Sequence, residues 1–286
     1  MNPLRLAQLS DFHWTHLTCN PIELCSKRLA GRVNWWLHRK ASFASAQVDA
    51  LPSLFAELGV ERVLLGGDFT SNALPQEYSQ ARNFVDALER PWIAIPGNHD
   101  HYTLTSYFRK RFYRYLSNEI GVGPFRLQDH GIEAHLLAPS WWLVALDTAR
   151  PSLTSRGRFS SALEARLQKL LASIPSNDSI LLFNHYPFFQ NDLPSRGLVR
   201  GEALEALCRS DTRIRAYLHG HTHRHIIADL QRSGYPVILD GGCVGFARGA
   251  TWNLLTLDNH GICIDVYRWR PSSWFVERTE RIAWMR

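Results

Sequence analysis

The chain has 286 residues, 45% of them hydrophobic, and a formal net charge of +6 at pH 7. A chain of this length and composition can bury one large core or two small ones. It contains no apolar run of about eighteen residues, which excludes a helix that crosses a bilayer. The basic excess suits an anionic partner such as a phosphorylated substrate, a nucleic acid or an anionic lipid.

The N-terminus and the cysteines indicate the compartment. The first residues, MNPLRLAQLSDFH, include no long apolar stretch of the kind found in secretory signals. The five cysteines are sparse and form no CxxC pair, which is typical of free thiols in a reducing compartment. We therefore expect a cytoplasmic protein, with any membrane contact peripheral and at the inner face of the cell membrane.

Short β-type runs alternate with longer helical patterns along the chain. In the first part we expect a strand over 4–10, a strand followed by a turn over 60–68 and again over 92–100, and helices over 75–89 and over 46–58, the latter interrupted by Pro52. In the second part we expect strands over 141–148, 179–187 and 213–223, a helix over 160–174, and a strand-rich end with runs at 235–242, 251–258 and 261–269. This order predicts an α/β fold whose sheets are covered by helices on their outer faces.

Polar side chains follow most of these strands, at the point where each strand ends. They are Asp11 and His13, Asp68, Asn98 with His99 and Asp100, His185, and His221 with His223. Ligand sites in α/β proteins assemble at strand ends, because the rigid strands direct several loops into one crevice. We therefore expect these side chains to form one site.

The side-chain types point to metal. Carboxylate, imidazole and amide groups suit Mn, Fe or Zn better than an all-sulfur structural zinc site does. Seven or more candidate ligands are too many for one ion, but they can serve two ions about 3.5–4 Å apart that share a bridging carboxylate. Taken singly, most of these motifs are ordinary strand-end loops, and GHTH alone fits either reading. Their joint occurrence, each after an apolar strand, favours a dinuclear site.

In this order the motifs resemble those of the calcineurin-like metallophosphoesterases. The family signature is D-x-H, G-D, G-N-H-D/E, H before x-P, and G-H-x-H, and it covers the chain from Asp11 to His223. The resemblance implies a single domain over 1–286 with a four-layer α-β-β-α sandwich. It also implies two divalent metal ions at one sheet edge, with Mn favoured and Fe, Zn or Co compatible.

The resemblance also assigns roles. It implies that one metal is held by Asp11, His13 and His223, the other by Asn98, His185 and His221, and that Asp68 bridges them. Two such cations lower the pKa of bound water and neutralise phosphoryl oxygens in the transition state. His99 would stabilise or protonate the leaving group, and Asp100 would orient a histidine. His219 and His225 receive no ligand role.

Two aromatic-basic segments bear on the substrate. Residues 20–40 form a basic insertion in which 22–37 carry an apolar stripe that includes Trp36. Such a helix can lie on an anionic membrane, although a helix packed on the domain explains the pattern equally well. The segment 103–116, which includes Arg109, repeats the mixture of aromatic and basic residues. Together these segments favour an amphiphilic substrate.

The stretch KRLAGRVNWWLHRK resembles a bacterial branch of the family that includes the chlamydial-type UDP-2,3-diacylglucosamine pyrophosphatase of lipid A synthesis. This resemblance implies hydrolysis of a nucleotide-lipid pyrophosphate to UMP and 2,3-diacylglucosamine 1-phosphate. Arg156 and Arg158 fit phosphate contacts because arginine forks match phosphate oxygens, although a solvated loop accounts for them as well. We predict substrate contacts from these two arginines, Trp36 and Arg109.

Two other functions stay open. A soluble phosphodiesterase acting on cyclic nucleotides would use the same metal site without the amphipathic segments. A metal-dependent scaffold protein with vestigial catalysis belongs to a different class, and the complete ligand set argues against it. The basic excess is modest and no nucleic-acid-binding module is present, so we do not expect a nucleic-acid partner. Nothing in the sequence indicates an obligate protein partner.

Overall fold

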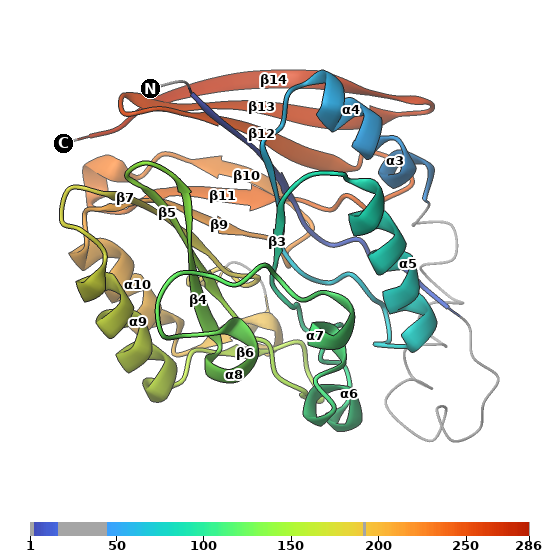
Figure 1. The fold of residues 1–286 in the computed structure, drawn as a ribbon, viewed down its shortest axis with the longest axis horizontal. Coiled ribbons are helices and arrows are strands. Elements are labelled where there is room, and N and C mark those ends of the chain that lie inside the picture. Colours follow the sequence, from blue (N-terminus) through green and yellow to red (C-terminus); the bar gives the residue numbers. More distant parts are fainter. Residues whose placement is uncertain (1–2, 17–44, 191–192, 286) are drawn as a thin grey trace.

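The computed structural model describes residues 3–16, 45–190 and 193–285 (Figure 1). The predicted insertion 20–40, with Trp36, lies outside these described residues. Within the described ranges, no helix is long and apolar enough to cross a membrane.

Two six-stranded sheets form the centre of the molecule. The first has the order β14-β13-β12-β1-β2-β3, with β1 (Leu4–Leu9), β2 (Arg62–Leu65), β3 (Trp92–Ala94), β12 (Thr251–Leu257), β13 (Gly261–Arg270) and β14 (Ser273–Ala283). The second has the order β10-β11-β9-β7-β5-β4, with β4 (Ile132–Ala138), β5 (Trp141–Leu146), β7 (Ser179–Phe183), β9 (Ile214–His219), β10 (His225–Ala228) and β11 (Val237–Gly241). A small separate sheet pairs β6 (Gly157–Arg158) with β8 (Leu198–Val199).

Helices cover the outer face of each sheet (Figure 1). The first sheet packs against α3 (Ala46–Asp49), α4 (Leu51–Glu57) and α5 (Pro75–Ala87), and the second against α9 (Ser161–Ser173) and α10 (Gly201–Ser210). A third apolar cluster, rich in leucine and isoleucine from both sheets, fills the space between them. The predicted single-domain, four-layer α-β-β-α sandwich is confirmed.

The local sequence explains the helices. Pro52 lies in the first turn of α4, where its missing N–H costs nothing because that N–H would have no helical partner. The helix is interrupted at Ala50, between α3 and α4. Leu163, Leu167 and Leu170 recur at helical spacing and form the buried face of α9. The hydroxyl of Ser160 caps that helix by accepting the N–H of Leu163.

Strand boundaries differ from the sequence-based expectation. The strands β7 and β9 end earlier than predicted, because the polar residues that follow them belong to loops, whereas β2 and β3 are followed by loops as expected. The expected strand 213–223 stops at His219, since Gly220 and two residues with left-handed φ follow. The segment 103–116 forms two short helices, α6 (Leu104–Phe108) and α7 (Arg111–Tyr115). The strands β4, β10 and β14 and helix α10 were not predicted.

Phe183→Ala tests the contribution of the layer between the sheets. Phe183 is fully buried in that layer, so its truncation should lower the free energy of unfolding by about 3–5 kcal/mol. Urea denaturation followed by circular dichroism measures the change. Leu136→Ala is the matched control, since Leu136 is 46% exposed on β4 and its truncation should cost less than about 0.5 kcal/mol. Equal losses for the two variants would contradict the assignment of this layer as core.

Candidate metal centre

Both sheets contribute to the site at the ends of their strands. In the first sheet β1 leads to Asp11 and His13, β2 to Asp68 and β3 to Asn98, and in the second β7 leads to His185 and β9 to His221 and His223. The three strands of the first sheet are neighbours in parallel pairing, and so are β7 and β9 in the second. Their carboxyl ends therefore meet at one edge of each sheet, and the packing of the sheets brings the two edges together.

Five of the predicted ligands have a left-handed backbone. The φ angles are 61° at Asp11, 53° at His13, 54° at Asp68, 71° at His221 and 57° at His223. Residues with a Cβ lose about 1–2 kcal/mol in this conformation, so it persists only where the surroundings enforce it. Such outliers gather at functional sites.

Two glycines allow the metal-binding loops to approach one another. A Cβ on Gly97 would lie 2.1 Å from Oδ1 of Asp68, and one on Gly67 would lie 2.6 Å from the amide nitrogen of Gly97. Gly67 also has a φ of +93°, which side-chain-bearing residues rarely adopt. Both positions therefore require glycine for the GGD and PGN loops to pack.

Four side chains form the first potential metal-binding group. One ligand atom from each of Asp11, His13, Asp68 and His223 lies within 4.8 Å of all the others. Nε2 of His223 lies 2.9 Å from Nε2 of His13 and 3.2 Å from Oδ1 of Asp11. Oδ2 of Asp11 accepts hydrogen bonds from Ser10 and the amide of His221, whereas buried Oδ1 makes none within the described ranges. This oxygen is therefore available to a cation.

A second group consists of Asp68, His185 and His221, again within 4.8 Å. Nδ1 of His185 donates to the carbonyl of Gly66 at 2.7 Å, and Nε2 of His221 donates to the carbonyl of Arg196 at 2.8 Å. A carbonyl can only accept, so these bonds place a proton on Nδ1 of His185 and on Nε2 of His221 and leave the other nitrogen of each ring as the candidate metal ligand.

Asn98 and Asp68 complete this arrangement. Oδ1 of Asn98 is buried and has no hydrogen-bond partner in the described part of the chain. Oδ2 of Asp68 lies 3.8 Å from Nε2 of His13 and 3.6 Å from Nε2 of His185. Asp68 thus belongs to both groups, as a bridging ligand must. The donor set fits two divalent cations.

The electrostatics of the site also require positive charge. Asp11 and Asp68 are fully buried, and burial would raise their pKa values, but the neighbouring histidines lower both pKa values below the usual range. Burial would lower the pKa of His185, yet the carboxylates of Asp68 and Asp11 raise it to about 9. Burial and nearby His185 lower the pKa of His221 to about 3. Two buried carboxylates at the centre of the site therefore need cations as counter-charge.

His99 lies beside the two groups and is only partly buried. Its ring meets that of His13 edge-on at 4.9 Å and stacks on Tyr102 at 5.5 Å. Its Nδ1 donates to the carbonyl of Ser71 at 2.8 Å, so a proton exchanged with a ligand would pass through Nε2. This geometry suits the predicted role at the leaving group.

Asp100 differs from its predicted role. We expected it to orient a histidine, but its carboxylate accepts the backbone amides of Phe69, Thr70 and Gly97. Burial and the charge of Asp68 raise its pKa to about 7. Asp100 therefore ties the GNHD turn to the loop that follows Asp68 and acts on the site through the backbone.

His219 and His225 stand apart from both groups. Nδ1 of His219 lies 3.0 Å from the carbonyl oxygen of Gly220, and Nε2 of His225 lies 2.6 Å from Oδ1 of Asn253. Neither belongs to a potential metal-binding group among the described residues. Of the histidines in YLHGHTHRH, the structure places only His221 and His223 in these groups.

The three arginines that we predicted to contact the substrate lie on the surface of the protein. Arg156, Arg158 and Arg109 are exposed, and Arg158 lies in β6. Sequence reasoning missed Asp147 and Arg150, which follow β5 at the same end of the second sheet. The rule that found the other residues, a polar residue after an apolar strand, also applies to VALDTAR.

The fold and this site define a metal-dependent hydrolase of phosphoester bonds, and comparisons with known proteins agree. The family model for calcineurin-like phosphoesterases matches residues 4–225, so the chain belongs to the calcineurin-like phosphoesterase family. A Synechococcus protein named "Probable cyclic nucleotide phosphodiesterase" is 27% identical over 212 residues, which cover 70% of this chain and 72% of that protein.

Solved structures share the fold. A dimetal phosphatase from Danio rerio matches with a TM-score of 0.71 at 14% identity, covering 99% of this chain and all (100%) of that one. GAP50, described as the anchor in the inner membrane complex of Plasmodium, matches with a TM-score of 0.59 at 12% identity, covering 100% of this chain and 90% of that one.

Asp68→Asn tests the bridging assignment. The substitution removes the charge shared by both groups, so bound metal should fall from about two ions per chain to one or none, and turnover of bis-p-nitrophenyl phosphate with manganese should drop more than about a hundredfold. Elemental analysis of purified protein and a colorimetric assay measure the two effects. His225→Gln is the control and should keep both. If Asp68→Asn retains its full metal content, the bridging role is wrong.

His99→Asn tests proton donation to the leaving group. The substitution should reduce kcat by about 10²–10⁴-fold for an alkyl phosphodiester, whose alkoxide needs a proton, with unchanged metal content. The loss should be much smaller for bis-p-nitrophenyl phosphate, because p-nitrophenolate departs without one. The measurement is kcat for the two substrates with wild-type and variant protein. An equal loss on both would exclude a proton-donating role.

Proposed function

We propose that this metallophosphoesterase hydrolyses the pyrophosphate bond of an amphiphilic nucleotide-lipid, UDP-2,3-diacylglucosamine, to UMP and 2,3-diacylglucosamine 1-phosphate. The observation that carries the lipid part is the apolar surface of α6. Leu104 and Phe108, one helical turn apart on that helix, are 62% and 75% exposed. The helix starts directly after the turn that bears His99.

The surroundings of α6 support an amphiphilic substrate. Arg109, Lys110, Arg111 and Arg114 follow the two exposed apolar side chains in sequence. Apolar groups next to cations suit acyl chains attached to a phosphorylated head group, and they also suit peripheral contact with an anionic membrane surface. The sequence of the insertion 20–40 has the same mixture of tryptophan and basic residues.

The side chains divide the reaction between them. Two divalent cations held by the seven ligands would acidify a water molecule and neutralise charge on the phosphoryl oxygens, with manganese our first choice. His99 donates a proton from Nε2 to the oxygen of the leaving phosphate as the bond between phosphorus and that oxygen breaks. Asp100 keeps the turn that carries Asn98 and His99 against the loop after Asp68.

A second candidate is hydrolysis of a cyclic nucleotide. It is favoured by the name of the Synechococcus relative. This reaction needs the same metal centre and the same proton donor, but it has no use for exposed apolar side chains on α6.

Product analysis separates the two candidates. Purified protein with manganese is incubated with UDP-2,3-diacylglucosamine in detergent and, separately, with cyclic AMP. We expect UMP from the first substrate and little AMP from the second. AMP without UMP would reject the lipid substrate, and inactivity on both and on bis-p-nitrophenyl phosphate would favour a scaffold protein.

Leu104→Ser sharpens this test. Loss of one exposed apolar contact should raise KM for the lipid substrate about tenfold and leave turnover of bis-p-nitrophenyl phosphate unchanged. Leu230→Ser is the matched control, because Leu230 is 41% exposed beside the η3 turn Gln231–Ser233. Equal effects of the two substitutions on KM would contradict the proposal that the exposed side chains of α6 bind the lipid.

A further inference from the structure

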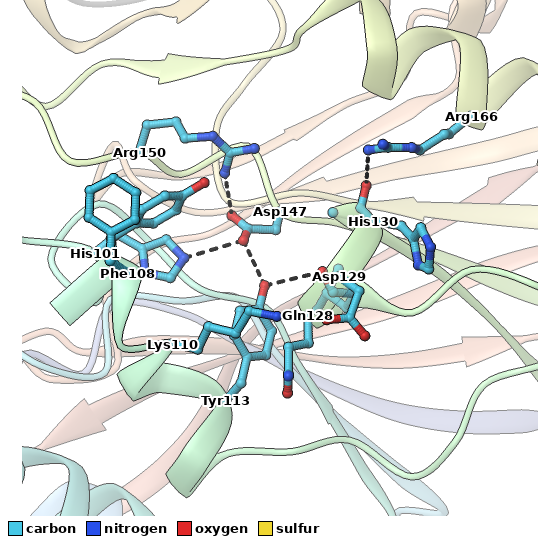
Figure 2. A pocket seen from close by; sticks show the side chains of 13 residues that line it. His101, Phe108, Lys110, Tyr113, Gln128, Asp129, His130, Asp147, Arg150 and Arg166 are labelled. Atoms are coloured by element: carbon cyan, nitrogen blue, oxygen red, sulfur yellow. Dashed lines mark hydrogen bonds and ion pairs between the residues drawn. The ribbon is translucent and has the colours of Figure 1, made fainter. Parts of the chain in front are cut away.

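A cavity of about 270 Å³ opens beside His101, two residues after His99 in the chain (Figure 2). It lies between α6, α7, the helix α8 (Leu127–His130), helix α9 and the loop after β5. Sites for drug-sized ligands measure about 300–1,000 Å³. The cavity is therefore too small for a whole nucleotide-lipid and has the size of one polar head group.

Three cations and two carboxylates line this cavity. The ammonium of Lys110 lies 2.6 Å from a carboxylate oxygen of Asp129, so this pair is internally balanced. Asp147 is buried and satisfied: it accepts the hydroxyl of Tyr113 at 2.6 Å and the amide of Ala149 at 3.0 Å, and it contacts His101 at 3.2 Å.

Two guanidinium groups keep most of their donors available. Within the described ranges, Arg166 makes one hydrogen bond, from Nη1 to the carbonyl of His130 at 2.7 Å. Nη1 of Arg150 donates to the carbonyl of Ala149 and lies 3.6 Å from Asp147, which is beyond hydrogen-bond length. In Figure 2 the guanidinium of Arg166 points from α9 toward the side where Arg150 approaches Asp147. Each guanidinium has five N–H donors, and its fork matches phosphate oxygens.

One wall of the cavity is aromatic. Tyr107 and Phe108 from α6 line it, and the guanidinium carbon of Arg150 lies 5.4 Å from the ring centre of Tyr107. An aromatic face beside arginines suits a ring, such as a sugar or a base, attached to a phosphate. Phe108 also continues the exposed apolar surface of α6 that includes Leu104.

Two segments of the chain lead from the cavity to the metal centre. His101 lines the cavity and is two residues from His99, so the two α-carbons are at most about 7 Å apart. The hydroxyl of Thr148, next to Asp147, donates to the side chain of Asn184 at 2.7 Å, and His185 follows directly.

Tyr186 is buried beside the metal centre. Its hydroxyl is fully buried without a hydrogen-bond partner in the described part of the chain, and its ring contacts His221 at 4.6 Å. This unsatisfied buried donor is one more polar group beside the metal centre that a ligand could satisfy.

We propose that this cavity binds a phosphomonoester dianion through Arg150 and Arg166, with the organic part of the ligand against Tyr107 and Phe108. The inference deepens the proposed function and rests on it for the biological source of the ligand, since both products, UMP and the lipid 1-phosphate, carry this group. The apolar surface beyond Phe108 favours the sugar phosphate of the lipid half.

Isothermal titration of manganese-loaded protein tests the assignment. The probes are UMP, glucosamine 1-phosphate and, as a baseline for binding at the metals, inorganic phosphate. Arg166→Gln and Arg150→Gln should each raise Kd for UMP or glucosamine 1-phosphate about ten- to a hundredfold, because each removes a charge-assisted hydrogen bond. Lys169→Gln, on the same helix as Arg166 but outside the cavity, is the matched control and should change no Kd.

The outcomes separate cleanly. A rise in Kd for glucosamine 1-phosphate in both arginine variants supports the proposal and assigns the cavity to the lipid half, and a rise for UMP supports it and assigns the nucleotide half. Unchanged Kd values for both organic probes in both variants would overturn it. The titration requires no turnover, so it can succeed even if UDP-2,3-diacylglucosamine is not hydrolysed, and the two proposals fail independently.

Discussion

The metal centre depends on one constraint: its two buried carboxylates, Asp11 and Asp68, need positive charge close to them. Removing a carboxylate from water costs several kcal/mol unless positive charge lies close by. The chain supplies histidines from both sheets, and the ligand atoms of each group lie within 4.8 Å of one another, close enough to share a cation. The left-handed backbone at five ligands and the side-chain-free contact between Gly67 and Gly97 follow from this constraint, because these loops must converge on the same two carboxylates.

The four-layer fold brings the loops that carry the metal ligands together. Asp11, Asp68 and Asn98 come from the first sheet, whereas His185, His221 and His223 come from the second. Neither sheet holds a complete ligand set, so the apolar layer between the sheets fixes the distance between the two halves of the metal centre. Interiors this densely packed deform little, which keeps the ligands in place before the metals bind.

The metal ligands could be predicted from the sequence because they follow apolar strands, whereas residues without such a local pattern could not. Asp11, Asp68 and Asn98 each follow an apolar strand, so their convergence at one edge could be predicted. The role of Asp100 could not, because its partners are backbone amides of a loop that is distant in sequence. Arg166 lies in the middle of α9, where no local pattern distinguishes a cavity-facing arginine from a solvated one. Trp36 lies outside the described residues.

The position of β1 determines when the site can form. β1 lies between β2 and β12, where Leu4 pairs with Leu257, and His13 meets His223 across 210 residues of chain. Contacts so distant in sequence are slow to form, and a ribosome delivers their C-terminal partners last. One edge of β1 therefore stays unpaired until its partner strand β12 has been synthesised, near the end of the chain. The first metal-binding group, which joins Asp11 and His13 to His223, can therefore form only after most of the chain has been synthesised.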